Sequence, residues 1–244
     1  MKKNIATLFL IVTLVSSVLS QRKFDSYGCR YKGKVATEVI EEAKITKVNG
    51  QYSESPKSFW HKAAYNLNGE LIEEYPVPGT CGSSPPDKRV KIVVDKEKNT
   101  RTEIAYDNRD KPLAKDVWTY DARGNVLDWS FYSFNKKSNK WRLWGRWVST
   151  YDEKGNQTKS VRLNGKGKME RGETYQYDER NNLTEHSWLR ADATIRDTLK
   201  YTYEYDEQGN WIKRTTWVRI TQVNASSFEP HEITYRTITY HTGN

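Results

Sequence analysis

The sequence has few of the residues on which small reactive sites depend. It contains two cysteines, Cys29 and Cys81, and they are not spaced as a Cys-x-x-Cys redox or metal motif. In an exported chain an isolated pair most often forms one structural disulfide, so we predict a Cys29–Cys81 bond that ties the N-terminal region. A catalytic thiol is the alternative, and no motif supports it.

Recognisable catalytic and metal motifs are also missing. The four histidines, His61, His186, His231 and His241, show no pair at metal-ligand spacing. There is no Gly-x-Ser-x-Gly nucleophile motif and no glycine-rich phosphate-binding loop. We therefore expect no metal, no cofactor and no catalytic residue of a familiar class. An enzyme with a hidden pair of carboxylates remains the alternative.

The N-terminus carries the one long apolar run. Residues 5–19 follow a short basic head, and small residues stand at Val18 and Ser20, which predicts a secretory signal peptide over residues 1–20, cut before Gln21. A membrane anchor is the alternative, but the run falls short of the roughly 20 residues that a span needs. We expect the mature chain, residues 21–244, to be secreted, periplasmic or at the cell surface, with no membrane span.

Aliphatic residues are scarce, and aromatic residues take their place. The chain has 9 Trp, 16 Tyr and 6 Phe, which favour half-buried pleated surfaces, so we predict one all-β domain over residues 21–244. The net charge is +9, or +7 without Lys2 and Lys3, and the charges are interspersed. A solvated surface explains this balance. Attraction to acidic glycans or lipid headgroups is the alternative, and export argues against nucleic acid.

A short motif, Tyr-Asp-x-x-Gly-Asn, recurs through the chain. Complete copies begin at Tyr120, Tyr151 and Tyr205, and weaker copies begin at Tyr65, Tyr106 and Tyr177. The Asp side chain accepts backbone N–H groups two residues on, and Gly or Asn takes the position with positive φ, so each copy is predicted to be a hairpin turn. The turn-forming pairs are Asp121 with Gly124, Asp152 with Gly155, Asp178 with Asn181, and Asp206 with Gly209.

The residues beside these turns alternate with the period of a β-strand. Residues 61–244 are therefore predicted to be repeated antiparallel hairpins in one long, twisted or curling meander sheet. Residues 21–60 form a less regular segment in which Ala36, Val39, Ile40, Ala43 and Lys47 have helical spacing, although their β-branched content also allows a strand. Residues 76–86 are predicted to be a loop, and residues 89–95 a strand that turns over residues 96–99 into the next.

These repeats resemble the YD-repeat (Rhs-type) family of bacterial surface and secreted proteins over roughly residues 60–214. The resemblance rests on the Tyr-Asp-x-x-Gly-Asn copies and their aromatic, alternating flanks. It implies repeated hairpins in a continuous curling sheet, with contact to carbohydrate or cell surfaces in some members and an encapsulated toxin domain in others. This chain departs from the toxin-carrying type because it is short and ends in a segment, residues 239–244, that is almost another repeat.

The segment Lys140-Trp-Arg-Leu-Trp-Gly-Arg-Trp147 is the predicted binding surface. As a regular strand it places Trp141, Leu143 and Trp147 on one face and Arg142, Trp144 and Arg146 on the other. A Trp between two Arg can stack on a sugar while the guanidinium groups bind hydroxyls or anions; the alternative is a half-buried Trp144 with paired arginines. We expect a non-enzymatic protein that binds extracellular or envelope glycans. A module that binds another protein and an enzyme with a hidden carboxylate site are the alternatives.

Overall fold

The computed structural model is all-β, as the sequence predicts. It describes residues 34–68, 71–75, 89–107, 109–222 and 225–242. Within these ranges the chain forms fifteen strands, and no helix has the length and hydropathy of a membrane span. The predicted signal peptide, Cys29 and Cys81 lie outside the described residues.

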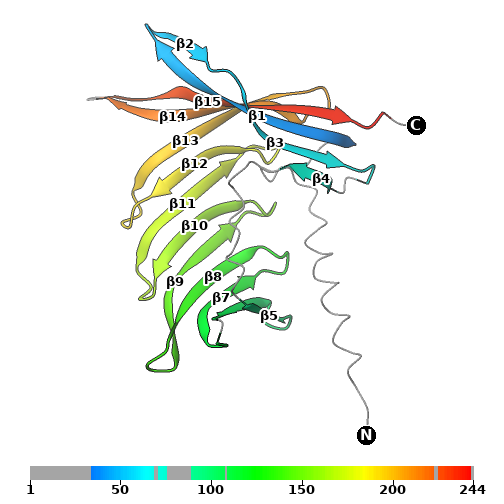
Figure 1. The fold of residues 1–244 in the computed structure, drawn as a ribbon. Coiled ribbons are helices and arrows are strands. Elements are labelled where there is room, and N and C mark those ends of the chain that lie inside the picture. Colours follow the sequence, from blue (N-terminus) through cyan, green and yellow to red (C-terminus); the bar gives the residue numbers. More distant parts are fainter. Residues whose placement is uncertain (1–33, 69–70, 76–88, 108, 223–224, 243–244) are drawn as a thin grey trace. The chain divides into compact units, whose positions relative to one another are not determined.

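The fifteen strands follow one another along the chain (Figure 1). Their bounds are β1 Val35–Val48, β2 Gln51–Glu54, β3 Ser58–Tyr65, β4 Leu71–Tyr75, β5 Arg89–Asp95, β6 Thr100–Tyr106, β7 Pro112–Tyr120, β8 Val126–Asn135, β9 Lys140–Tyr151, β10 Gln157–Asn164, β11 Met169–Tyr177, β12 Leu183–Leu189, β13 Ile195–Tyr205, β14 Trp211–Gln222 and β15 Ala225–Tyr240.

The sheet is a meander from β5 to β15, and then it departs from sequence order. Strands β5 to β15 are hydrogen-bonded in sequence, β15 next pairs with β1, β1 with β3, and β3 with β4. By its contacts the chain divides into two compact units. Unit 1 contains the described residues among 1–78, 203–214 and 232–244, and unit 2 contains the described residues among 79–202 and 215–231.

The predicted turns at Asp107, Asp121, Asp152, Asp178 and Asp206 form, and they share one hydrogen-bond pattern. The copy that begins at Tyr65 includes residues 69–70, which lie outside the described residues. In the turn that begins at Asp152, the N–H of Asp152 donates to the carbonyl of Asn156 at 2.9 Å, and the N–H of Gly155 donates to the carbonyl of Asp152 at 3.1 Å. The Asp152 carboxylate also accepts the backbone N–H of Asn156 at 2.8 Å and its side-chain amide at 2.9 Å. The position with positive φ is taken by Gly124, Gly155, Gly209 and, as predicted for the weaker copy, Asn181.

The turns at Asp107, Asp121, Asp152 and Asp178 are each followed by a β-bulge. In the Asp152 hairpin, Gln157 pairs with Tyr151 and Lys159 with Thr150, so Thr158 is the extra residue. Leu127 and Thr184 take the same place after the turns at Asp121 and Asp178. A bulge adds one residue to one strand. Side chains beyond it therefore lie on the opposite face from the one that regular alternation along the strand predicts.

The β10–β11 and β12–β13 hairpins contain two further copies of the same turn, with a different sequence. The N–H groups of Asn164 and Arg190 donate to the carbonyls of Lys168 and Thr194, each at 2.9 Å. Residues with positive φ again occupy the fourth position, and they are Gly167 and Ala193. These copies lack the Tyr-Asp pair, and for that reason the motif did not reveal them.

Ala193 should be replaceable by glycine with a gain in stability. Its φ of 65° places the backbone of Ala193 in the left-handed region. There Cβ lies too close to a carbonyl oxygen, which costs a residue with a side chain roughly 1–2 kcal/mol and costs glycine little. Because glycine also loses more entropy on folding, we expect Ala193→Gly to raise the free energy of unfolding by about 0.5–1 kcal/mol in urea titration. An unchanged or lower midpoint would contradict this prediction. Gly167→Ala, the reverse change in the matching turn, should destabilise.

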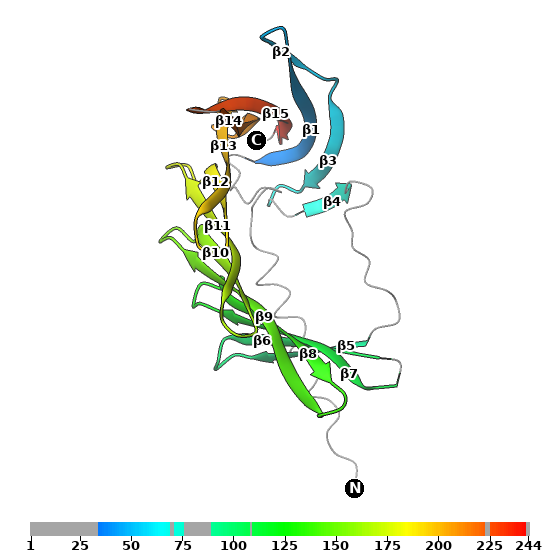
Figure 2. The same ribbon diagram turned by 90° about the vertical axis from the view of Figure 1, so that its left-hand side faces the viewer.

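The described part of the segment predicted to be irregular, residues 34–60, is mostly β-strand. Ala36, Val39, Ile40 and Ala43 lie in β1, so the helical alternative is wrong and the strand alternative is confirmed. Nine residue pairs join β1 to β15, from Val35 opposite Tyr240 to Lys44 opposite Glu232, and β1 also pairs with β3. In Figure 2 these three strands lie side by side within unit 1.

Candidate functional site: a tryptophan row on unit 2

The predicted binding segment in β9 contains a bulge, whereas the prediction assumed a regular strand. Phe131 of β8 pairs with Gly145, and Tyr132 pairs with Leu143, so Trp144 is the extra residue. Gly145 is required here, because a Cβ would lie 2.8 Å from the Leu163 carbonyl oxygen and 3.0 Å from the Phe131 ring. A glycine inside a strand often marks a bulge, so Gly145 was the signal in the sequence that could have indicated this one.

The bulge makes the predicted division of faces wrong. Trp144 lies on the same side as Trp147, where its ring is 5.3 Å from that of Phe131 and 4.9 Å from the Arg162 guanidinium. Arg146 pairs in register with Ser130 and forms an ion pair with Asp128 at 3.2 Å on the opposite face. Arg142 pairs with Ser133, on the face that carries Trp129 and Trp147, so Arg142 and Trp144 share a face as predicted. Arg146 and Trp147 have exchanged faces, so the predicted group of Arg142, Trp144 and Arg146 does not come together. Trp144 is 62% exposed, as a binding residue requires.

Three tryptophans from three neighbouring strands instead line up on one face of unit 2. Trp118 of β7 pairs in register with Trp129 of β8, and Trp129 pairs with Trp147 of β9. The rings of Trp118 and Trp129 are parallel within 8°, with centroids 6.0 Å apart. We call Trp118, Trp129 and Trp147 the tryptophan row.

Arginines continue the tryptophan row at both ends. Arg101 of β6 is the register partner of Trp118, with its guanidinium 5.8 Å from the ring. Arg162 of β10 is opposite Trp147, and Arg171 of β11 is opposite Arg162. Arg171 also lies 5.3 Å from the Trp147 ring. With strands about 4.8 Å apart, this line of six side chains spans roughly 24 Å across the sheet.

A hollow of about 350 Å³ lies along the tryptophan row. Its lining combines aromatic rings with hydrogen-bonding groups: Trp118, Val126, Trp129, Trp147, Ser149, Tyr151, Gln157, Ser160, Glu173 and Tyr175. Trp129 is 37% exposed, so its ring is partly available to a ligand. The arrangement can stack on flat apolar faces and bond to hydroxyl groups at the same time.

Glu173 is held at one side of this hollow by two neighbours. The Tyr175 hydroxyl donates to its Oε2 at 2.6 Å, and His186 Nε2 lies 3.0 Å from the same oxygen. His186 in turn stacks on Tyr175 and contacts the tilted ring of Trp188, with centroids 4.7 and 4.1 Å away. Burial raises the pKa of Tyr175, and the Glu173 carboxylate raises it further, so this phenol stays a donor at neutral pH.

Asp116 lies on the other side of the tryptophan row, opposite Glu103 in register. Burial raises the pKa of Asp116, a 3.3 Å hydrogen bond from Trp129 Nε1 lowers it, and the charge of Glu103 raises it. Glu103 is ion-paired with Arg101. Among the described residues, no three His, Cys, Asp or Glu side chains come together as metal ligands.

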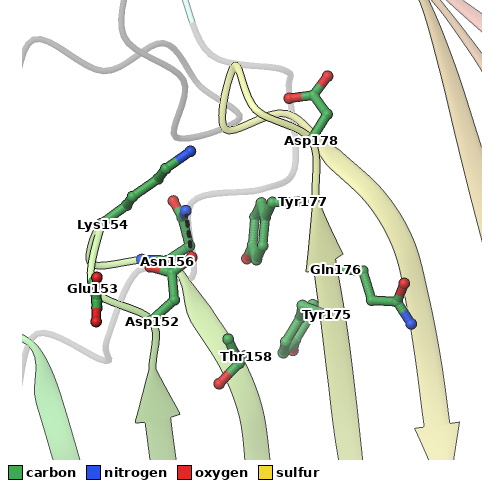
Figure 3. A pocket seen from close by; sticks show the side chains of 9 residues that line it. All are labelled: Asp152, Glu153, Lys154, Asn156, Thr158, Tyr175, Gln176, Tyr177 and Asp178. Carbon is green, nitrogen blue, oxygen red and sulfur yellow. Dashed lines mark hydrogen bonds between the residues drawn. The ribbon is translucent and has the colours of Figure 1, made fainter.

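A second hollow of about 350 Å³ separates two successive turns of the repeat (Figure 3). Tyr177 donates its hydroxyl to the carbonyl of Gln157 at 3.0 Å, and Lys154 Nζ donates to the carbonyl of Glu179 at 3.2 Å. Tyr151 and Arg123 make the same two kinds of bond one repeat earlier, to the carbonyls of Val126 and Glu153. The polar groups here join repeat to repeat, so we assign this hollow a structural role.

Comparisons with known proteins leave the family open. No protein-family model matches the chain, and no curated protein matches it. Among solved structures, it is similar to a porin-like protein from Bacteroides uniformis, at 10% identity and a TM-score of 0.35 over 86% of this chain and 99% of that one. A protein of unknown function from Bacteroides fragilis matches at 16% identity and a TM-score of 0.24, over 62% and 91% of the two chains. The Tc holotoxin pore of Photorhabdus luminescens matches at 11% identity and a TM-score of 0.31, over 78% of this chain and 11% of that one. Likenesses this weak carry no argument about function, and the YD-repeat resemblance of the turns stays a prediction.

Proposed function

We propose that the chain is an exported, non-enzymatic repeat protein that binds an extracellular or envelope polysaccharide through the tryptophan row. The observation that carries the proposal is the register of Trp118, Trp129 and Trp147, which places three indole rings side by side on one face. Sugar rings have apolar faces that stack on such surfaces, and binding sites for them combine aromatic rings with a few placed polar groups.

Polar residues lie beside the tryptophan row, and two of them, Ser149 and Ser160, are buried and hydrogen-bonded to each other. On β9, Ser149 follows Trp147 by two residues and so lies on the same face. Its register partner on β10 is Ser160, and the partner of Ser160 on β11 is Glu173. Arg101 and Arg171 at the two ends supply charge-assisted donors for hydroxyl, carboxylate or sulfate oxygens. In this arrangement Trp144, next to Arg162, extends the platform beyond Trp147.

The positions of the carboxylates favour binding over hydrolysis. Asp116 on β7 and Glu173 on β11 are separated by four strand spacings, about 19 Å, whereas glycosidase carboxyl pairs lie roughly 5–9.5 Å apart. Glu103 is close to Asp116 but is engaged by Arg101. An intact polysaccharide after incubation with the protein is therefore the expected result.

A glycan array with matched tryptophan variants tests the proposal. We expect Trp129→Ala to lower affinity for the bound glycan about tenfold, as loss of a stacking platform of roughly 1–1.5 kcal/mol implies. Trp141→Ala is the control, because Trp141 packs on Phe134 on the opposite face and should leave binding unchanged. Equal binding by the parent, Trp129→Ala and Trp147→Ala would overturn the site. Release of sugar fragments by the parent would overturn the non-enzymatic assignment.

A further inference from the structure

Strand β5 is the last strand at one end of the sheet order, and β6 is its one partner among the described residues. It pairs with β6 over seven consecutive positions, from Arg89 opposite Tyr106 to Asp95 opposite Thr100, without a bulge. Among the described residues no strand pairs with its other edge. That edge therefore presents a regular row of backbone donors and acceptors.

The four apolar side chains of β5 are exposed to an unusual degree. Val90, Ile92, Val93 and Val94 are 52%, 54%, 46% and 45% exposed. Edge strands that avoid association are short, bulged, or carry charges or proline. The opposite end of the sheet order follows this rule, since β4 has five residues, two consecutive glutamates and a bulge in its pairing with β3. β5 has no bulge and no proline, and its charged residues, Arg89, Lys91 and Asp95, do not interrupt the exposed run from Ile92 to Val94.

We infer that β5 pairs with β5 of a second copy of this chain, antiparallel, about a two-fold axis at Val93. In this register Lys91 lies opposite Asp95 of the second copy, Ile92 lies opposite Val94, and Val93 lies opposite Val93. Both ends of the contact then join opposite charges around an apolar centre. The strand is thus complementary to itself, which is what a closed two-fold interface requires.

The faces of the strand agree with this register. Ile92 and Val94 alternate with Lys91, Val93 and Asp95, so each proposed pair joins side chains on the same face. Asp95 is already oriented by the following turn, where its Oδ1 accepts the N–H groups of Glu97 and Lys98, each at 3.1 Å. A two-fold axis perpendicular to the sheet also keeps the tryptophan rows of both copies on one face. A dimer would therefore hold a long glycan at two sites.

Cross-linking at the axis tests the register. Val93→Cys should give a covalent dimer with a short thiol reagent, because the two residues at position 93 face each other. Val90→Cys is the matched control, since two residues at position 90 would be six positions apart, roughly 20 Å. The parent, with Cys29 and Cys81 alone, gives the background. Equal linking of the Val90→Cys and Val93→Cys variants would overturn the inference.

Sedimentation of the full chain over a wide concentration range tests the association itself. We expect a monomer–dimer equilibrium in the parent, and a dimer at least tenfold weaker in Val93→Lys and Lys91→Glu, which set like charges opposite each other. Both positions are exposed, so circular dichroism should show an unchanged fold. A parent that remains a monomer, or that grows without limit into larger species, would overturn the two-fold pairing.

Discussion

Replacing Arg236 by methionine should cost unit 1 about 3–5 kcal/mol of folding free energy. Arg236 is 3% exposed and its guanidinium lies 3.6 Å from the carboxylate of Glu38, which is fully buried. Its Nε also donates to the carbonyl of Trp211 at 2.8 Å, and the guanidinium stacks 3.9 Å from the Trp211 ring centroid. Arg236→Met would leave a buried carboxylate without its cation, a loss comparable with the whole stability of many domains.

The same unit offers a control and a rescue. Lys213 and Glu204 form an exposed ion pair at 2.8 Å, so Lys213→Ala should change stability by less than about 1 kcal/mol. A Glu38→Leu/Arg236→Met double variant removes both charges and should recover much of the loss. Hydrogen exchange of β1 and β15 measures these effects within unit 1. A loss below about 1 kcal/mol for Arg236→Met would contradict the prediction.

Sequence alone sufficed for the turns because their chemistry is local. An Asp that accepts backbone N–H groups and a Gly or Asn with positive φ lie within six residues, so the motif contains the complete turn. The same reasoning failed where those residues are replaced, as in the turn from Arg190 to Thr194. That turn keeps the backbone bonds of the repeat while Ala193 bears the strained φ.

The candidate site could not be predicted in full because it depends on register. Regular alternation along β9 predicted Trp147 on the same face as Trp141, whereas the bulge at Trp144 moves Trp147 to the other face. The alignment of Trp118, Trp129 and Trp147 then requires the bulges of successive hairpins to act together. The pairing of β1 with β15 joins residues about two hundred positions apart, and no local pattern specifies such a contact.

Asp152→Ala should destabilise unit 2 by about 2 kcal/mol. The substitution removes the acceptor of the Asn156 backbone and side-chain hydrogen bonds, at 2.8 and 2.9 Å, and bonds to a charged group contribute about 1.5–3 kcal/mol. The damage should spread, because Arg123 donates to the carbonyl of Glu153, and Asn156 donates to the side-chain oxygen of Asn181 at 3.2 Å. Hydrogen exchange should therefore rise in the turns before and after the substituted one. Glu153→Ala, an exposed change in the same turn, is the control.

The pH dependence of this effect separates the carboxylate bonds from a simple loss of contact. Burial acts to raise the pKa of Asp152, but the bonds from Asn156, Lys154 and Gly155 lower it below its ordinary value of 3.8. The unfolded chain therefore binds its proton at a higher pH than the folded chain, and the contribution of Asp152 is complete above about pH 4 and is lost as the pH falls through the lower, folded value. The difference in unfolding free energy between the parent and Asp152→Ala should accordingly be largest near neutral pH and shrink in acid. A difference that stays constant from neutral pH down to the acid limit of folding would show that the charge of Asp152 plays no part in holding the turn.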